Sequence, residues 1–273
     1  MTDTENRIAA ERRLPSADRD AEHVAGHWLL ARLGKRVLRP GGIELTRTLL
    51  RLAKLTDADV LEFAPGMGRT ASEIIAAHPR SYVGAEQNPD AARLVTDIVA
   101  GHGEVRVADA EETGLPDASR DVVIGEAMLT MQGEKAKNAI VAEAARVLRP
   151  GGRYAIHELA LTPDALSDEI KTDVQQSLAR SIKVNARPLT IAEWTKLLAD
   201  NGLVVDEVET VPMALLEPRR LISDEGLFGA LRFASNLILQ PDARRRVLAM
   251  RQTFRKYKKE MAAVAIIAHK PAA

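Results

Sequence analysis

Hydrophobic residues occur in short runs and in longer periodic stretches that alternate along residues 59–158. Short apolar runs of strand length occupy residues 60–63, 82–85, 105–107, 122–124 and 154–156. Stretches with apolar residues at helical spacing lie between them, over residues 70–78, 91–100 and 136–148. Strands that alternate with helices indicate βαβ units. The pattern therefore predicts an α/β protein with a parallel sheet that helices cover on both faces.

The hydrophobic pattern changes after Glu158. Residues 191–198 predict a helix that begins at Thr190, and residues 203–211 and 262–268 predict two more strands. A long helical insertion, residues 213–260, separates these two strands. Two apolar stripes at helical spacing run along it, first Leu227, Leu231, Ala234 and Ile238, then Val247, Met250, Phe254 and Tyr257.

Composition places the chain among ordinary globular proteins. Of its 273 residues, 46% are hydrophobic and 28% are charged, so a full core can form. The 38 Lys and Arg residues balance 38 Asp and Glu residues, which argues against a dedicated nucleic-acid binder. Aromatic residues make up only 3%, which argues against a base-stacking platform. Cysteine is absent, so disulfides, thiolate metal sites and a cysteine nucleophile are excluded.

The N-terminal twenty residues are charged throughout and contain no apolar core of a signal peptide. The chain has no stretch of about 18 uncharged apolar residues, so we expect no integral membrane segment. These two observations together predict a cytoplasmic protein.

A glycine loop follows the first predicted strand, where residues 60–68 read VLEFAPGMG. Glycines at positions 66 and 68 allow positive φ angles and let a ligand approach the backbone. Ligands of parallel sheets bind at the carboxyl ends of the strands. Glu86 ends the second predicted strand, where a carboxylate can accept both hydroxyls of a ribose. Asp109 ends the third and can accept from an adenine amino group.

These features together resemble the motifs of the class I S-adenosylmethionine-dependent methyltransferases of the small-molecule type. Residues 62–68 match the first family motif, Glu86 the second and Asp109-Ala110 the third. Residues 115–123 (LPDASRDVV) and 146–152 (RVLRPGG) resemble the segments around the family's fourth and fifth strands. The resemblance implies a doubly wound, Rossmann-like seven-stranded sheet, mostly parallel with an antiparallel last strand, plus a helical lid.

The same resemblance implies S-adenosyl-L-methionine as the cofactor and suggests which residues contact it. Glu62 would face the methionine ammonium, and Gly66 and Gly68 would form the floor of the site. Glu86 would hold the ribose. The full expected cofactor-binding set is Gly42, Glu62, Ala64, Gly66, Gly68, Glu86, Gln87, Asp109, Ala110 and Glu126. Ala64 departs from the family pattern, which usually has glycine at this position.

Methyl transfer from a sulfonium needs alignment and exclusion of water more than it needs acid–base groups. His157 and Glu158 follow the fifth strand at the ligand side of the sheet, so they are the expected catalytic residues. His27 is a further candidate base. No histidines and carboxylates stand at a metal-ligand spacing, so we predict no metal. The residues expected to form the substrate lid are His27, Trp28, Met213, Phe228 and Phe233.

We expect a single domain with three parts. Residues 1–55 would form an N-terminal helical cap, residues 56–160 the S-adenosylmethionine-binding core, and residues 161–273 the rest of the sheet with helical lid insertions. The lid would select a small-molecule acceptor, for which quinone-like, lipid, polyketide and amine compounds all remain open. The basic run within residues 244–259 is typical of a solvated face, with an anionic substrate or membrane surface as alternatives. A homodimer also remains open.

Two other functions are compatible with the glycine loop. Gly66, Gly68 and Ala71 fit the dinucleotide fingerprint of an NAD(P)-dependent oxidoreductase. Glu62 argues against it, because an acid at the start of the loop suits a ligand ammonium and not a pyrophosphate. The second alternative is a non-catalytic S-adenosylmethionine-binding protein, which a turnover measurement would distinguish from an enzyme.

Overall fold

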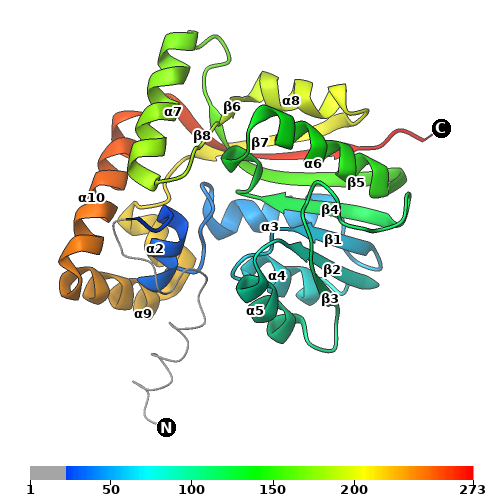
Figure 1. Ribbon diagram of the computed structural model, residues 1–273, viewed down its shortest axis with the longest axis horizontal. Coiled ribbons are helices and arrows are strands. Elements are labelled where there is room, and N and C mark those ends of the chain that lie inside the picture. Colours follow the sequence, from blue (N-terminus) through cyan, green and yellow to red (C-terminus); the bar gives the residue numbers. More distant parts are fainter. Residues whose placement is uncertain (1–22, 273) are drawn as a thin grey trace.

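The computed structural model describes residues 23–272 and contains one mixed sheet (Figure 1). Its strands are β1 (Asp59–Phe63), β2 (Ser81–Glu86), β3 (Glu104–Val107), β4 (Arg120–Glu126), β5 (Leu148–Leu161), β6 (Leu189–Thr190), β7 (Val204–Pro212) and β8 (Met261–His269). The strand order is β3-β2-β1-β4-β5-β8-β7, and β8 runs antiparallel to both neighbours. The predicted fold is confirmed. The described sheet has eight strands where seven were predicted, because the two-residue β6 pairs with the end of β5.

Helices connect the strands and cover both faces of the sheet. They are α2 (Gly26–Arg32), α3 (Gly42–Ala53), α4 (Arg69–Ala76), α5 (Pro89–Val99), α6 (Glu134–Val147), α7 (Asp168–Ile182), α8 (Ile191–Asp200), α9 (Pro218–Leu239) and α10 (Pro241–Lys256), with a 3-10 turn η1 (Leu129–Met131). No helix within residues 23–272 is long and apolar enough to cross a membrane.

Successive residues of the central strands are buried on opposite faces of the sheet. Leu61 and Val123 belong to a core cluster with α6 and α8. Val60 and Val122 belong to another cluster with α3, α4 and α5. Side chains alternate between faces along a strand, so a strand covered on both faces must be apolar at consecutive positions. This explains why these strands appear in the sequence as unbroken apolar runs.

Local capping signals set the start of two helices. The Asn88 side chain accepts hydrogen bonds from the backbone N–H groups of Asp90 and Ala91, and Pro89 occupies the first turn of α5. Thr190 and Glu193 form a reciprocal capping box at the start of α8. Helix α8 begins at the predicted residue, and α5 begins at Pro89, two residues before the predicted stretch 91–100. Both starts are set locally, because these caps act through residues only two or three positions apart.

The helices α9 and α10, which we call the lid, lie beyond the carboxyl ends of the parallel strands (Figure 1). Because α10 leads into β8, whose first residue Met261 pairs with the last residue of β5, the lid stands at that edge of the sheet. The lid shares an apolar cluster with α2, in which Leu29, Phe233 and Met250 are buried. Helix α7 packs against α10. The lid and α2 therefore pack together as a layer over the ligand end of the sheet.

A buried ion pair fixes the N-terminal segment to the lid. Lys35 is completely buried and donates a hydrogen bond to Asp224 of α9 at 3.2 Å. The second carboxylate oxygen of Asp224 accepts from the backbone N–H of Ile43 at 3.0 Å. A Cβ on Gly42 would lie 2.4 Å from Asp224, so glycine is needed there for this close approach, whereas the sequence suggested a cofactor contact. Removing one partner of such a pair would leave an uncompensated buried charge.

Candidate active site

A cleft opens at the carboxyl ends of β1, β2 and β4. The strand order reverses at β1, which lies between β2 and β4, and such switch points are where parallel sheets bind ligands. Of the expected cofactor residues, the cleft brings together Glu62, Ala64, Gly66, Glu86, Gln87 and Glu126. The N-terminal segment closes one side with His27, Trp28, Arg36, Leu38 and Arg39.

Three more of the expected cofactor residues, like Gly42, lie outside the lining of the cleft. Asp109 is adjacent to it, because its carboxylate accepts a hydrogen bond from Gln87 at 2.9 Å. Ala110 is buried in the core cluster under α6. Gly68 packs against α5, where a Cβ would lie 2.5 Å from the side chain of Ile98. Glycine at position 68 is favoured by its φ of +69°, at the residue that precedes α4.

Glu86 holds the glycine loop and still has capacity to accept more hydrogen bonds. One carboxylate oxygen accepts from the backbone N–H of Gly66 at 2.9 Å, and the other from that of Asn88 at 2.9 Å. Each carboxylate oxygen has two lone pairs, so each can accept one further hydrogen bond. A pair of vicinal hydroxyls, as on a ribose, fits this arrangement.

The loop after β1 has a left-handed backbone at three positions. The φ angles are +48° at Ala64, +57° at Gly66 and +69° at Gly68. An L side chain in this region costs about 1–2 kcal/mol, so Ala64 is strained where the family usually has glycine. A Cβ on Gly66 would meet only the Ala64 carbonyl, at 3.7 Å. A side chain at position 66 would therefore project into the cleft.

Glu62 is an acid that burial keeps protonated. Burial raises the pKa of its carboxyl to about 8, although the hydrogen bond from the Tyr82 hydroxyl at 2.7 Å and the nearby Arg39 charge counteract part of this effect. At neutral pH the carboxyl is therefore mostly protonated. A cation placed against it would stabilise the ionised form, so this position suits an ammonium group.

Glu126 is the centre of a buried polar network. It pairs with Arg39 at 2.8 Å and accepts hydrogen bonds from Thr46 at 2.7 Å and Thr70 at 2.5 Å. His157 donates a further hydrogen bond at 2.8 Å. Burial alone would raise the pKa of Glu126, but the Arg39 charge and the bond from His157 outweigh it and lower the pKa to about 2. The carboxylate is therefore ionised and anchors Arg39 at the wall of the cleft.

His157 is completely buried and uses both ring nitrogens. Its Nε2 accepts from the backbone N–H of Gly41 at 3.0 Å, so its proton lies on Nδ1 and is donated to Glu126. Both ring nitrogens are therefore occupied within the protein. This geometry supports a positioning role in place of the expected catalytic one, because His157 holds the Gly41 turn and Glu126 in place.

Sequence reasoning did not single out Arg39. The residue precedes the turn Pro40-Gly41-Gly42, and a charged residue beside such a turn was the one signal that could have found it. Arg39 lines the cleft near Glu62, and within residues 23–272 its Nη1 is buried with no hydrogen-bond partner. A buried donor without a partner is costly, so this nitrogen fits an anionic group of a ligand.

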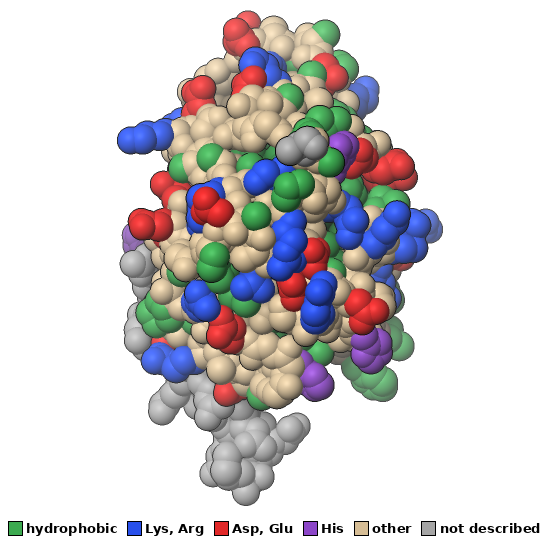
Figure 2. Space-filling view, turned by 90° about the vertical axis from the view of Figure 1, so that its right-hand side faces the viewer, with side chains coloured by type: hydrophobic (Ala, Val, Ile, Leu, Met, Phe, Trp, Pro, Cys, Tyr) green, Lys and Arg blue, Asp and Glu red, His purple; other side chains and the backbone are tan. Residues whose placement is uncertain are grey.

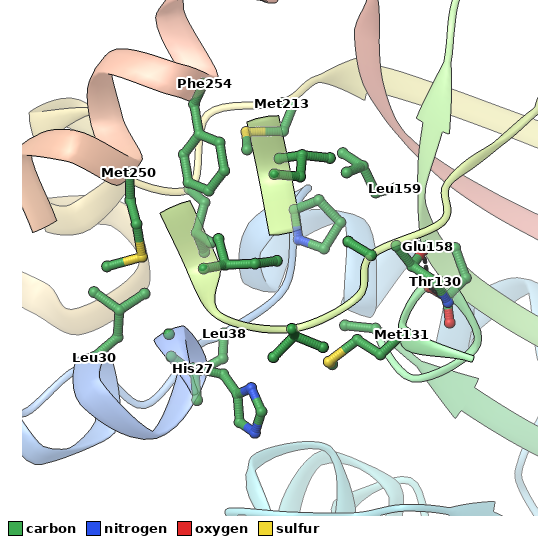
Figure 3. A pocket seen from close by; sticks show the side chains of 18 residues that line it. His27, Leu30, Leu38, Thr130, Met131, Glu158, Leu159, Met213, Met250 and Phe254 are labelled. Carbon is green, nitrogen blue, oxygen red and sulfur yellow. Dashed lines mark hydrogen bonds between the residues drawn. The ribbon is translucent and has the colours of Figure 1, made fainter. Parts of the chain in front are cut away.

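A second hollow, which we call the chamber, adjoins the cleft (Figure 3). His27, Leu38, Ala127 and Met131 line both, so the two hollows are adjacent. The remaining walls come from the helices α2, α7 and α10, from η1 and β5, from the turn before α3, and from the segments after α7 and β7. They are Gly26, Leu30, Pro40, Thr130, Glu158, Leu159, Leu178, Ile182, Val184, Ala186, Met213, Leu215, Met250 and Phe254. Nearly all of these side chains are apolar.

Glu158 borders the chamber, but its carboxylate is engaged by the 3-10 turn η1. It accepts hydrogen bonds from the backbone N–H groups of Met128, Leu129 and Thr130 at 2.8–3.1 Å. The Thr130 hydroxyl donates a fourth bond at 2.7 Å (Figure 3). Burial raises the pKa of Glu158, and these four bonds counteract it. This geometry supports a capping role in place of the expected catalytic one.

His27 is the remaining titratable side chain of the chamber, and it stands at the junction with the cleft. Burial lowers its pKa to about 4, so the imidazole is neutral at physiological pH. The neighbouring Trp28 ring lies 4.9 Å away, centroid to centroid, and lines the cleft. Both residues therefore lie where the sequence analysis expected substrate contacts.

The other three expected lid residues have different surroundings. Met213 lines the chamber. Phe233 is buried between the lid and α2, and Phe228 is 87% exposed at the surface. The two phenylalanines of α9 therefore do not line the chamber, contrary to the expectation from the sequence. The lid residues that do line it are Met250 and Phe254 of α10. Within residues 23–272, no cluster of three or more His, Asp or Glu side chains could hold a metal.

Comparison with known proteins agrees with this geometry. A family model described as a methyltransferase domain matches residues 61–156, the segment that holds the glycine loop and Glu86. A Haemophilus influenzae protein of uncharacterised function is 31% identical over 256 residues, which cover 92% of this chain and all of that protein. The chain belongs to the class I S-adenosylmethionine-dependent methyltransferase family. This methyltransferase is thus not the NAD(P)-dependent oxidoreductase considered as an alternative.

Two further relatives show how far the similarity extends. The 27-O-demethylrifamycin SV methyltransferase of Amycolatopsis mediterranei is 31% identical to this methyltransferase over 104 residues, covering 38% of this chain and 36% of that one. The phosphoethanolamine N-methyltransferase 2 of Haemonchus contortus, solved with S-adenosylhomocysteine, has a TM-score of 0.65 at 16% identity. That match covers 86% of this chain and 54% of the other. It establishes the shared fold.

Proposed function

We propose that this enzyme transfers the methyl group of S-adenosylmethionine to a small, neutral, apolar acceptor held in the chamber. The observation that carries this proposal is that a polar cleft with the family's cofactor motifs shares four lining residues with an almost wholly apolar chamber. In-line displacement requires an acceptor beside the methyl donor, and a chamber next to the cleft supplies that place.

The cleft residues fit the cofactor. The two oxygens of Glu86 suit the ribose hydroxyls, and Glu62 suits the ammonium. The partnerless Nη1 of Arg39 suits the methionine carboxylate. When bound, S-adenosylmethionine supplies a methyl group already activated on sulfur. The contribution of the protein is then to bind the cofactor and the acceptor, to align them for transfer, and to exclude water from the site.

The polarity of the chamber supports a neutral acceptor. Its two titratable side chains are Glu158, which four hydrogen bonds occupy, and His27, which burial keeps neutral. A charged acceptor would lose its hydration and find no counter-ion among these walls. An apolar acceptor would instead be stabilised by roughly 25 cal/mol for each Å² of apolar surface that it buries.

His27 is the residue that we propose as the proton acceptor where the acceptor atom carries a hydrogen. Its neutral imidazole stands at the junction of cleft and chamber. Because its pKa is about 4, the imidazole is unprotonated throughout the physiological range, and it is a weaker base than an exposed histidine. His27→Gln should slow transfer to a hydroxyl acceptor and leave the affinity for S-adenosylhomocysteine unchanged.

The test follows a labelled methyl group. Purified protein and S-adenosylmethionine labelled in its methyl group are incubated with a cell extract, which is then partitioned between water and an organic solvent. We expect the label in a neutral, organic-soluble product. Label in a water-soluble amine or acid would contradict the apolar acceptor. Cofactor binding without transfer to either phase would favour the non-catalytic binding protein.

A matched variant separates this enzyme from contaminating activities. Glu86→Ala should lower the yield of labelled product about tenfold or more at limiting cofactor. A substitution on β3, Glu104→Ala, should leave the product unchanged, because Glu104 is exposed and pairs with Arg106. If both variants lose activity equally, the label does not arise through this cleft.

A further inference from the structure

Helix α9 has two apolar faces, of which one is buried. Ala230 and Phe233 are buried on the face towards α2 and α10. The opposite face carries Leu227, Leu231 and Ile238 at helical spacing, and all three point outward. Phe228 and Leu239 lie beside them. We call these five residues the outer stripe. Their exposed fractions range from 58% for Leu231 to 87% for Phe228.

An exposed apolar stripe of this length on a surface helix indicates an interaction surface. Single exposed apolar residues are ordinary, but contiguous patches on soluble proteins usually mark interaction sites. The other lid helix also exposes a large apolar side chain, because Leu248 of α10 is 54% exposed. The two helices meet in a corner between Leu239 and Pro241. Figure 1 shows this corner at the end of the molecule away from the C-terminus.

The lid that carries the stripe is strongly basic. Helices α9 and α10 contain nine Lys and Arg residues and three Asp and Glu residues, although the whole chain has a net charge of zero. Two of the three acids, Asp224 and Glu225, are directed at Lys35 and the backbone of residues 36 and 37. These two acids therefore do not offset the basic residues on the outer surface. Glu44, Glu217 and Asp173 of neighbouring segments pair with Arg220, Arg251, Arg255 and Lys256. The positive charge of the outer face therefore rests on exposed arginines such as Arg232 and Arg244.

Exposed arginines border the stripe. Arg232 follows Leu231 on the exposed side of α9, and Arg244 and Arg245 stand at the start of α10 beside Leu248. The opposite end of the molecule differs, because Figure 2 shows basic and acidic side chains intermingled there. Basic residues beside large apolar side chains on one helix face are the pattern of a helix that lies on an anionic lipid surface.

We propose that the outer stripe and its bordering arginines dock this enzyme onto an anionic lipid bilayer. The side chains of Leu227, Phe228 and Leu231 enter the interfacial region, and the arginines contact lipid phosphates. A second copy of the chain is the poorer occupant, because a symmetric contact through α9 would bring together two faces that each carry exposed arginines.

Docking in this orientation brings the chamber close to the bilayer. Met250 and Phe254 of α10 line the chamber, and Leu248 of the same helix is exposed. The lid therefore has one side on the chamber and another on the proposed lipid surface. The docking surface rests on the stripe and the charge alone, so it stands or falls separately from the proposed acceptor.

The test is co-sedimentation of the full chain with lipid vesicles. Vesicles of phosphatidylcholine alone are compared with vesicles containing about one third phosphatidylglycerol, which supply the negative surface potential. We expect sedimentation with the anionic vesicles only, and release when the salt is raised from about 0.1 M to about 1 M, where the Debye length falls to about 3 Å. Equal binding to both vesicles, or binding to neither, would overturn the proposal.

Variants identify the surface. Phe228→Gln with Leu231→Gln should weaken binding to anionic vesicles at least about tenfold, because two large apolar side chains no longer insert. The double substitution Arg244→Glu, Arg245→Glu should also weaken binding to anionic vesicles, because it replaces two positive charges with two negative ones. Val107→Gln on β3 is the matched control, since Val107 is also exposed, and it should bind as the wild type. Circular dichroism and affinity for S-adenosylhomocysteine should remain unchanged in all variants.

A further measurement detects the competing occupant. Sedimentation equilibrium of the wild type at micromolar concentration should give a monomer. A dimer that the Phe228→Gln, Leu231→Gln variant converts to a monomer would assign the stripe to a second copy and overturn lipid docking. Loss of vesicle binding in the Val107→Gln control would also overturn it, because the effect would then not belong to α9.

Discussion

The cleft and the chamber adjoin each other, yet they are built from different parts of the chain and by different physics. The cleft takes its cofactor motifs from three strand ends within residues 62–126, and it binds through charges and fixed backbone. The chamber draws on segments from Gly26 to Phe254 and offers almost only apolar surface. A site that must recognise one polar cofactor needs specific hydrogen bonds, whereas a site for an apolar acceptor needs an apolar cavity of sufficient volume that excludes water. Substitutions should therefore affect the two independently.

Gly66→Val should have the largest effect. The branched side chain would project into the cleft at a φ of +57°, so binding of S-adenosylhomocysteine in calorimetry should be lost. Gly101→Val is the control, because Gly101 has a φ of +80° with no atom within 4 Å of a Cβ. It carries similar backbone strain without touching the cleft and should bind normally. Normal binding by Gly66→Val would show that the loop is not the floor of the site.

Glu86→Ala should weaken cofactor binding about tenfold or more, because charged hydrogen bonds contribute about 1.5–3 kcal/mol each. The affinity of an apolar ligand for the chamber should not change. Calorimetry with S-adenosylhomocysteine measures the first effect. Circular dichroism checks that the variant still folds, because Glu86→Ala also removes the hydrogen bond from the glycine loop. Unchanged cofactor affinity in a folded variant would remove Glu86 from the site.

Glu62 should make cofactor affinity depend on pH. Its pKa of about 8 means that the carboxyl carries a proton in the cofactor-free protein, and a bound ammonium favours the loss of that proton. The dissociation constant for S-adenosylhomocysteine should therefore fall as pH rises from about 5.5 to about 7, by at most about tenfold per unit for one proton released. Glu62→Gln should flatten this dependence. A flat profile in the wild type would contradict the assignment of Glu62 to the ammonium.

Val184→Phe should affect the chamber alone. Val184 is half-buried in the chamber wall, so the larger ring would occupy part of the acceptor volume. We expect a severalfold rise in KM for the acceptor identified by the labelling experiment, with cofactor affinity unchanged. Val107→Phe, at an exposed site on β3, should change neither. A parallel loss of cofactor affinity would mean that cleft and chamber are not separable.

Ala64→Gly should have the smallest effect. Glycine relieves about 1–2 kcal/mol of left-handed strain but adds unfolded-state entropy that costs about 0.4–1 kcal/mol. The free energy of unfolding should therefore rise by between about 0 and about 1.6 kcal/mol in a urea titration, with cofactor affinity preserved. A clear loss of stability would mean that the alanine methyl contributes packing that outweighs its strain.

The sequence was most informative where function depends on local backbone. Glu62, Gly66 and Glu86 were found because each stands at a fixed place relative to the end of an apolar run, and parallel strands bring those ends together. The caps at Asn88 and Thr190 were equally local. Such signals need only a few neighbouring residues, so they determined the α/β fold and most of the cleft.

Tertiary packing decided which distant residues contact these motifs. Nothing local shows that Arg39 meets Glu126 or that His157 accepts a bond from the Gly41 N–H, because these partners are 87 and 116 residues apart. The apolar pattern of α9 was visible in the sequence, but a helix that is apolar on two faces does not indicate which one is buried. Packing against α2 chose the face of Phe233 and left Phe228 outside. The sequence by itself determined the fold and the cofactor motifs, and only the tertiary structure decided which side chains form the chamber and which face outward, because burial depends on neighbours that are distant along the chain.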